Sequence, residues 1–302
     1  MKRSEVIFIF ELMKVALIQL HIAVFLAGFT GILGVLISLN EMQLVWYRIM
    51  ITVVSLLLLL KINKTSLALP LKTKIRLLGI GTIIALHWVA FYGSIKLANV
   101  SIGLVCFSSV GFFTAILEPL IVTKKMRWIE LLLGLISLAG IYLIFHFDAR
   151  YQIGILVGLV SALLAAIFSV LNKKHVETAA PQIMMLYELS GGLSILTLLM
   201  PVYLYFFPKA ALIPTLQDWG WLIILSWLCT IVAMQLMFKS LKKVSAFTQN
   251  LSLNLEPVYA IIMAFILFNE NEKLQTSFFV GVALIIFSVV LQMSRVVIGR
   301  KY

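Results

Sequence analysis

Apolar stretches of roughly 18 to 25 residues recur along almost the whole chain, and a helix of that length can cross the hydrocarbon core of a bilayer. The composition agrees with this pattern, because 62% of the 302 residues are hydrophobic and only 12% are charged. Soluble domains carry about twice that charged fraction. The sequence therefore predicts an all-α polytopic membrane protein.

Ten transmembrane helices are predicted. They cover residues 14–38, 42–60, 75–95, 99–122, 128–146, 152–172, 182–206, 219–238, 244–268 and 275–294. Most connections are only a few residues long, so consecutive helices are expected to be antiparallel neighbours without a separate soluble domain. The sequence contains no phosphate-binding glycine loop, which indicates that any transport is secondary or passive.

The net charge of +12 would suggest a nucleic-acid partner in a soluble protein, but the distribution of basic residues gives a different explanation. One set of predicted loops holds most of them, including Lys72, Lys74, Lys124 and Lys242, while the other set holds Lys96, Arg150, Lys209 and Lys273. An excess of basic residues marks the cytoplasmic side of a membrane protein. With an even number of spans, both termini are expected to be cytoplasmic, and no nucleic acid is expected to bind.

The two halves of the chain resemble each other. KLANVSIGLVCFSSVGFF (96–113) parallels SLKKVSAFTQNLSLNLEP (240–257), EMQLVWYR (41–48) parallels PQIMMLYE (181–188), and LLLGLISLAGIYLI (131–144) parallels SFFVGVALIIFSVV (277–290). Each half, 1–148 and 149–302, holds five predicted spans, so the second half must be inverted relative to the first. Inverted repeats are typical of secondary transporters with a midplane substrate site, although a duplicated structural protein could show the same pattern.

These residues also carry a family resemblance. LEPVYAIIMAFILFNE after KSLKKVSAFTQNLSL, together with HWVAFYGSIKLANVSI and YELSGG, resembles the EamA-type branch of the drug/metabolite transporter superfamily. The resemblance implies a bacterial inner-membrane exporter or exchanger of amino acids or similar small metabolites, without a cofactor. The chain departs from strict repetition at one place, since Glu256-Pro257 aligns with Phe112-Phe113 and Glu118-Pro119 lies six residues later.

Two glutamates in apolar runs are candidates for proton coupling or gating. Glu256 is predicted about 18 Å from the start of its span, near the midplane, and Pro257 removes a backbone donor that the helix needs. Glu118 is expected nearer the cytoplasmic end, close to Lys124. The structural alternatives are a kinked helix with a neutral, hydrogen-bonded Glu256 and a snorkelling or lysine-paired Glu118.

A second group of polar residues within the spans is predicted to bind substrate. The repeat alignment superposes Arg48 on Glu188, and at their predicted depths the two side chains could pair across the interface when the site is empty. Alternatively Arg48 could clamp a substrate carboxylate, or it could snorkel or contact backbone carbonyls. Tyr187 and Asn254 complete this part of the predicted site.

His87, Trp88 and Tyr92 form an aromatic cluster in the predicted span 75–95, and such a cluster could stack against a substrate. Packing against lipid or a neighbouring helix is the commoner reason for such a cluster. A single histidine without acidic or thiol partners at ligand spacing argues against a metal site.

The sequence therefore predicts a transporter, not an enzyme, that moves a small polar metabolite, with amino acids as the leading class. A lipid or lipid-carrier flippase of the same architecture is the alternative. An enzyme would need a converging nucleophile and base, or a metal cluster, which the sequence does not offer. The partners expected are the small-molecule substrate and the bilayer, and both a monomer and a homodimer remain open.

Overall fold

The computed structural model describes residues 3–98, 100–144, 152–208, 212–256, 258–259 and 276–298. All regular elements within these ranges are helical. They are α1 (Arg3–Leu36), α2 (Glu41–Ile62), α3 (Leu71–Leu97), α4 (Val100–Phe107), α5 (Val110–Val122), α6 (Trp128–Ile144), α7 (Gln152–His175), α8 (Pro181–Phe206), α9 (Leu216–Ser226), the π-helix η2 (Trp227–Val232), α10 (Ala233–Leu241), α11 (Ala246–Leu253) and α13 (Thr276–Ile298).

Local sequence signals explain where several helices begin and end. At the start of α9, the Thr215 hydroxyl accepts from the Asp218 N–H while the Asp218 carboxylate accepts from the Thr215 N–H, which is a complete capping box. Pro181 occupies the first turn of α8, where its missing N–H leaves no intrahelical bond unmade. Thr123 ends α5 in the left-handed region, with φ 57°.

Seven helices in the described part of the chain are long and apolar enough to cross a membrane. They include α1, α2, α3, α7, α8 and the continuous stretch Leu216–Leu241. The shorter apolar helices are Val110–Val122 and Trp128–Leu143. The all-α membrane prediction is confirmed, while the count of ten and the inversion of the two halves stay predictions. Pro257 and the last part of the predicted span 244–268, from residue 260 onward, lie outside the described residues.

The prediction of one continuous helix over 99–122 is wrong. The helix is interrupted at Ser108 and Ser109, between α4 and α5. The Ser109 hydroxyl donates to the Cys106 carbonyl at 2.5 Å, and its N–H reaches only three residues back to the same carbonyl. Serine side chains that bond the local backbone compete with the helical hydrogen-bond pattern, and here they accompany the break.

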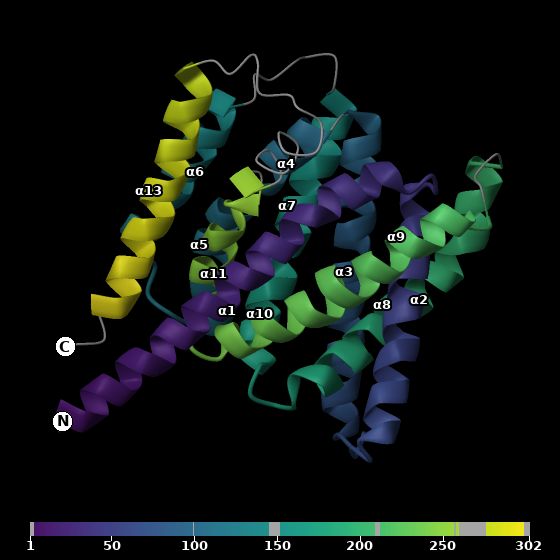
Figure 1. Cartoon of the computed structure of the whole chain (residues 1–302), viewed down its shortest axis with the longest axis horizontal. Coiled ribbons are helices and arrows are strands. Elements are labelled where there is room, and N and C mark those ends of the chain that lie inside the picture. Colours follow the sequence, from purple (N-terminus) through teal and green to yellow (C-terminus); the bar gives the residue numbers. More distant parts are fainter. Residues whose placement is uncertain are drawn as a thin grey trace.

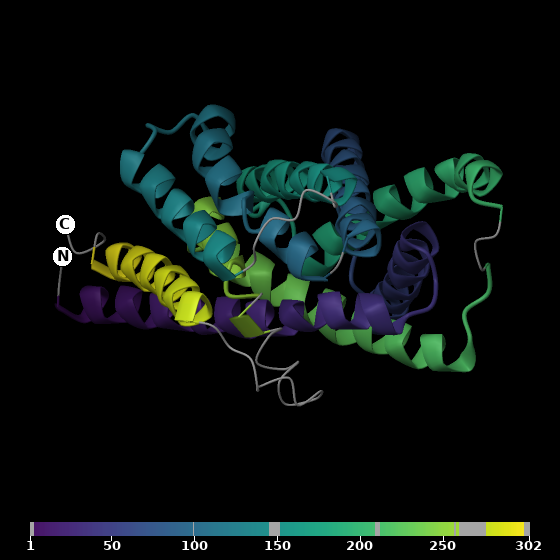
Figure 2. The same ribbon diagram turned by 90° about the horizontal axis from the view of Figure 1, so that it is seen from above.

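The helices form a central bundle with a peripheral pair. α3 packs against α7 and α8, and α1 runs alongside η2 and α10 (Figure 1). α6 and α13 pair with each other at one edge of the bundle, as both views show (Figure 2). Their backbones approach closely, since a Cβ added at Gly140 would lie 2.7 Å from the Gly281 carbonyl oxygen.

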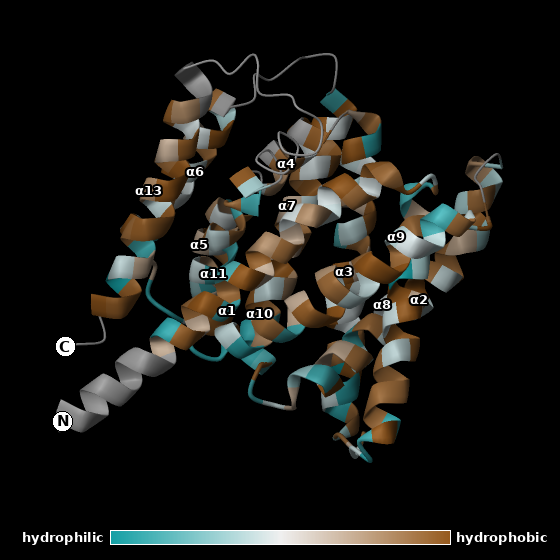
Figure 3. Cartoon of the chain, in the orientation of Figure 1, coloured by the Kyte–Doolittle hydropathy of each residue, from teal (hydrophilic) through white to brown (hydrophobic). Residues whose placement is uncertain are grey.

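Large apolar side chains cover the outside of the bundle. Leu58, Leu120, Leu198 and Phe287 are each more than half exposed in the isolated chain, and hydrophobic residues dominate the helices throughout (Figure 3). Such a surface is unfavourable in water and suits a lipid environment. This agrees with a multi-pass membrane protein.

Candidate functional site

A cavity of about 110 Å³ lies inside the bundle, between helices from both halves of the chain. α1, α2, α3 and α4 contribute residues from the first half, and α7, η2, α10 and α11 contribute residues from the second. Its polar lining consists of Thr30, Arg48, His87, Ser169, Asn172, Gln249 and Glu256. The cavity therefore brings together ionisable side chains that are far apart in the sequence.

Arg48 is the cation of this cavity and is only 3% exposed. Its Nε donates to the Thr230 hydroxyl at 2.8 Å, and its Nη1 donates to the Tyr92 hydroxyl at 3.1 Å. A longer contact of 3.4 Å joins its Nη2 to the Cys229 carbonyl oxygen. The guanidinium carbon also lies 3.9 Å from the centre of a Trp88 ring, in cation–π geometry.

Glu256 faces the same cavity and is equally buried. Its Oε1 lies 3.2 Å from the Thr30 hydroxyl, which also lies 2.7 Å from the Ala27 carbonyl oxygen. The chain leaves the helical path just before this glutamate, because α11 ends at Leu253 and the N–H groups of Asn254 and Leu255 each reach back only three residues. The helix is therefore interrupted beside Asn254 and Glu256.

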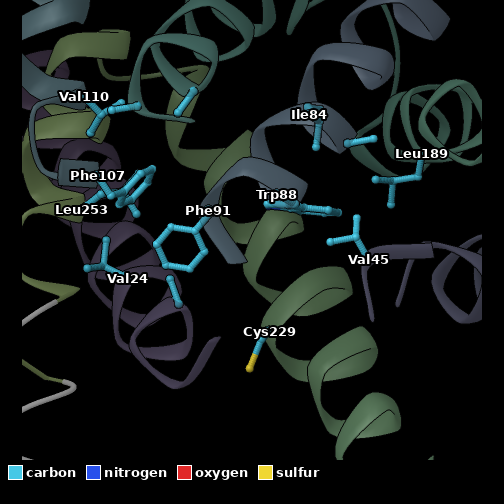
Figure 4. Packing of buried hydrophobic residues seen from close by; sticks show 14 of the residues in the cluster. Val24, Val45, Ile84, Trp88, Phe91, Phe107, Val110, Leu189, Cys229 and Leu253 are labelled. Atoms are coloured by element: carbon cyan, nitrogen blue, oxygen red, sulfur yellow. The ribbon is translucent and has the colours of Figure 1, made fainter. Parts of the chain in front are cut away.

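Aromatic rings form one wall of the cavity. The His87 ring is 5.4 Å from both the Phe107 and the Phe168 rings, measured between centroids, and Phe91 is 5.4 Å from Phe107. Figure 4 shows Trp88 and Phe91 on α3, with Phe107 and Leu253 near Phe91 and Cys229 across from them. His87 Nδ1 lies 2.9 Å from the Ser161 carbonyl oxygen, so α7 orients the imidazole ring.

The structure places only some of the predicted site residues in the cavity. Arg48, His87, Trp88 and Glu256 line it, and Tyr92 reaches it through Arg48. Asn254 instead donates to the Ser137 hydroxyl at 2.8 Å. Tyr187 is away from the cavity, donating to the Leu67 carbonyl at 2.6 Å.

The predicted pairing of Arg48 with Glu188 is wrong for this conformation. Glu188 is fully buried and accepts from the Asn172 amide at 3.4 Å, while Arg48 is engaged by Thr230 and Tyr92. The prediction rested on the similar depths expected for the two residues along the membrane normal. The rotation of α8 about its own axis, which turns Glu188 toward α7, separates them.

Glu118 joins α5 to the start of α11. Its Oε2 accepts from the Phe247 N–H at 2.8 Å, and its Oε1 accepts from the Ala246 N–H at 3.3 Å. Lys124 pairs with the same carboxylate at 3.1 Å, so the lysine-paired interpretation holds. A negative charge at a helix N-terminus is favourable, and Glu118 thus connects helices of the two halves.

At the opposite end of the bundle, Asp218 connects α9 to the segment after α1. Its carboxylate accepts from the Ser38 N–H at 2.8 Å and from the Ser38 hydroxyl at 2.7 Å, in addition to Thr215. Lys96 donates to the neighbouring Leu39 carbonyl. These bonds close this end of the bundle between α1, α3 and α9.

Several cavity residues were not predicted from the sequence. Thr30, Ser169, Asn172 and Gln249 line the cavity, and Thr230 binds Arg48; all are uncharged polar residues within apolar spans, and helical spacing alone did not single them out. The π-helix that presents Cys229 and Thr230 to Arg48 has no signal in the sequence. Among the residues the structure describes, no group of three or more His, Cys, Asp or Glu side chains is placed to hold a metal ion.

Comparisons with known proteins agree with this architecture. The model of the EamA-like transporter family matches residues 14–146 and again residues 152–294. A crystal structure described only as that of a protein superposes with a TM-score of 0.74 at 13% identity, covering 91% of this chain and 96% of the other. Comparison with curated proteins gives no match. Because the family model matches both halves and nearly the whole chain, the protein belongs to the EamA-like transporter family and is a multi-pass membrane transporter.

Proposed function

We propose that this chain is a secondary transporter that exports or exchanges small polar metabolites bearing a carboxylate, amino acids among them, across the bacterial inner membrane by alternating access. The observation that carries this proposal is the cavity between the two halves, which Arg48 and Glu256 both line. Charged residues inside a membrane protein are costly and usually mark substrate or ion pathways. Burial of both side chains favours a metabolite carrier over a lipid flippase.

Arg48 is suited to bind a carboxylate. A guanidinium has five N–H donors in a planar fork, and two of them make hydrogen bonds of 2.8 and 3.1 Å to Thr230 and Tyr92. The Nη2 group has only the 3.4 Å contact to the Cys229 carbonyl. A carboxylate entering the cavity can therefore replace that contact with a shorter, charge-assisted bond.

The hydrogen bonds around Glu256 can accommodate either the ionised or the protonated carboxyl group. A hydroxyl carries only one proton, so Thr30 cannot donate to Ala27 and to Glu256 at the same time. An ionised Glu256 can accept the Thr30 proton at 3.2 Å; when that proton is instead donated to the Ala27 carbonyl, at 2.7 Å, a lone pair of Thr30 faces Glu256 Oε1. A protonated Glu256 can donate to that lone pair, and this supports a role in proton coupling.

The packing of the helices supports two inverted halves, 1–148 and 149–302. α1 packs on η2 and α10, and the corresponding helix of the second half, α7, packs on α3. Likewise α2 packs on α9, and its counterpart α8 packs on α3. The breaks at Ser108–Ser109 and at Asn254–Leu255 fall at nearly matching positions of the repeat alignment. A midplane cavity between such halves is typical of alternating-access transporters.

The cavity extends toward the side on which both termini are proposed to lie. Its lining residues Asn172, Leu241 and Gln249 are near the basic residues Lys173 and Lys242, which the charge pattern assigns to the cytoplasm. At the opposite end, Asp218 and Ser38 hold α9 and α1 together. We infer a conformation that is closed to the outside.

Counterflow in proteoliposomes tests the proposed function. Vesicles loaded with a mixture of amino acids should accumulate a labelled amino acid from outside, while vesicles loaded with the corresponding amino acid amides should not. Protein-free vesicles provide the control. Translocation of a fluorescent lipid, together with no amino acid counterflow, would contradict the metabolite-carrier function and support the flippase.

Glu256→Gln is expected to abolish accumulation driven by a pH gradient while leaving counterflow largely intact. Glutamine resembles the protonated acid in shape and polarity but cannot release a proton, so exchange can continue without coupling. Uptake measured with and without an imposed pH gradient separates the two activities. Glu177→Gln, which changes an exposed carboxylate, is the matched control. A purely structural Glu256 would instead lower the yield of folded protein without changing the pH dependence.

A further inference from the structure

The π-helix η2 leaves a backbone carbonyl without its usual helical partner. In an α-helix the Ala233 N–H would donate to the carbonyl four residues back, that of Cys229. Here it donates instead to the carbonyls of Leu228 and Thr230. The Cys229 residue lies on the cavity wall and is 5% exposed, so this buried carbonyl lacks the Ala233 N–H that α-helical winding would give it.

Arg48 supplies a side-chain donor to this carbonyl, and Thr230 binds the same guanidinium. Arg48 Nη2 contacts the Cys229 carbonyl at 3.4 Å, and Nε donates to the Thr230 hydroxyl at 2.8 Å. The same hydroxyl donates to the Leu225 carbonyl, five residues back, at 2.8 Å. In α-helical winding that carbonyl would accept from the Cys229 N–H. Arg48 and Thr230 therefore contact carbonyls of the π segment and of the turn that precedes it.

We propose that Arg48 holds η2 in its π winding and that a ligand carboxylate, by taking over Arg48, allows the segment to rewind as an α-helix and turn α10. The ligand class in this statement rests on the proposed function. A ligand shifts such an equilibrium only through a difference in its interactions with the two states. The two states differ in the donor to the Cys229 carbonyl. In the π winding the donor is Arg48, and in the rewound α-helix it is the Ala233 N–H.

Rewinding changes the cavity, because α10 forms one of its walls. Met234, Met237, Phe238 and Leu241 all line it from α10. Removing a single-residue π insertion shifts the register by one residue, which corresponds to a rotation of about 100° for everything that follows in the helix. π-Helical turns occur frequently at functional sites. The rotation would move the wall between the cavity and the end of the bundle that carries Lys173 and Lys242.

Thr230 is thus a positioning residue, and its neighbourhood provides a matched comparison. Thr52 is also a fully buried threonine next to Arg48, but its hydroxyl donates to the Arg48 backbone carbonyl at 2.8 Å and makes no bond to the guanidinium. Replacing either threonine by valine removes one buried hydroxyl of the same size. Only Thr230→Val removes a bond that the π winding uses.

Spin-label distances measure the rotation directly. Lys61 on α2 and Lys239 on α10 are both exposed, and each can be changed to a labelled cysteine in protein carrying Cys106→Ala and Cys229→Ser. A label about 5 Å from the helix axis moves by about 8 Å in a 100° rotation. The probe is a mixture of amino acids, compared with the corresponding amides, and thermal stabilisation of the same samples reports binding.

We expect amino acids, but not amides, to displace the Lys61–Lys239 distance, and Thr230→Val to produce the same displacement without ligand. Thr52→Val should leave the distance unchanged. If Thr230→Val does not fold, Arg48→Met should produce the displacement instead, because it removes the Arg48 bonds to Thr230 and to the Cys229 carbonyl. Stabilisation by amino acids with unchanged distances in the ligand-bound protein and in the variants would overturn the coupling while leaving the proposed function intact. A displacement in Thr230→Val without any effect of amino acids would support the winding switch and reject the ligand class.

Discussion

Gly81→Ala is expected to separate α3 from α8 and to remove most of the folded protein. A Cβ at position 81 would overlap the backbone carbonyl group of Glu188, and Gly191 on α8 makes a comparably close approach to the backbone of Leu78. Small residues allow such backbone approach between membrane helices. The backbone cannot move aside as a flexible side chain can. The free energy of unfolding should therefore fall by about 3 kcal/mol or more, the upper end of overpacking effects.

Gly79→Ala is the matched control, because a Cβ at that position would meet nothing within 4 Å. Both glycines lie on α3, and alanine is favoured over glycine within a helix by about 0.8–1.0 kcal/mol. Gly79→Ala should therefore be neutral or slightly stabilising. Thermal unfolding in detergent, followed by the loss of the monodisperse peak in size-exclusion chromatography, measures both variants. Equal melting temperatures would show that α3 and α8 do not depend on this contact.

Arg48→Ala is expected to remove binding of carboxylate-bearing substrates. Truncating one member of a buried, hydrogen-bonded charge pair costs about 2–5 kcal/mol, which corresponds to a fall in affinity of about 30-fold or more. The variant also leaves the Thr230 and Tyr92 hydroxyls without their shared partner. Titration of amino acids against the thermal stability of the purified protein measures the change in affinity.

Two comparisons make the Arg48 experiment specific. Arg76→Ala removes an exposed arginine from α3 and should leave binding unchanged. Amino acid amides, which lack the carboxylate, should lose little affinity in Arg48→Ala compared with the wild type. An equal loss for acids and amides would mean that Arg48 shapes the cavity without binding the carboxylate.

The sequence by itself determined the class of the protein and much of its layout. Long apolar stretches and the low charged fraction indicate membrane-spanning helices, because the hydrocarbon core accepts little else. The structure confirms helices close to the predicted bounds, such as α2 at Glu41–Ile62 and α8 at Pro181–Phe206. The paired segments around 96–113 and 240–257 indicated a duplication, and the family model matches both halves. These are local patterns, readable along one chain.

Only the tertiary structure decided which polar residues meet. Depth along the membrane suggested that Arg48 and Glu188 could pair, but contact also depends on how each helix is rotated and packed. Close glycine packing of α3 on α8 and the turn of Glu188 toward Asn172 separate the two charges. Two of the partners that Arg48 does have, Thr230 and the Cys229 carbonyl, lie on the π-helix η2, which packs against α1 and α2. Winding of that kind reflects contacts distant in sequence, so no short stretch of residues could indicate it.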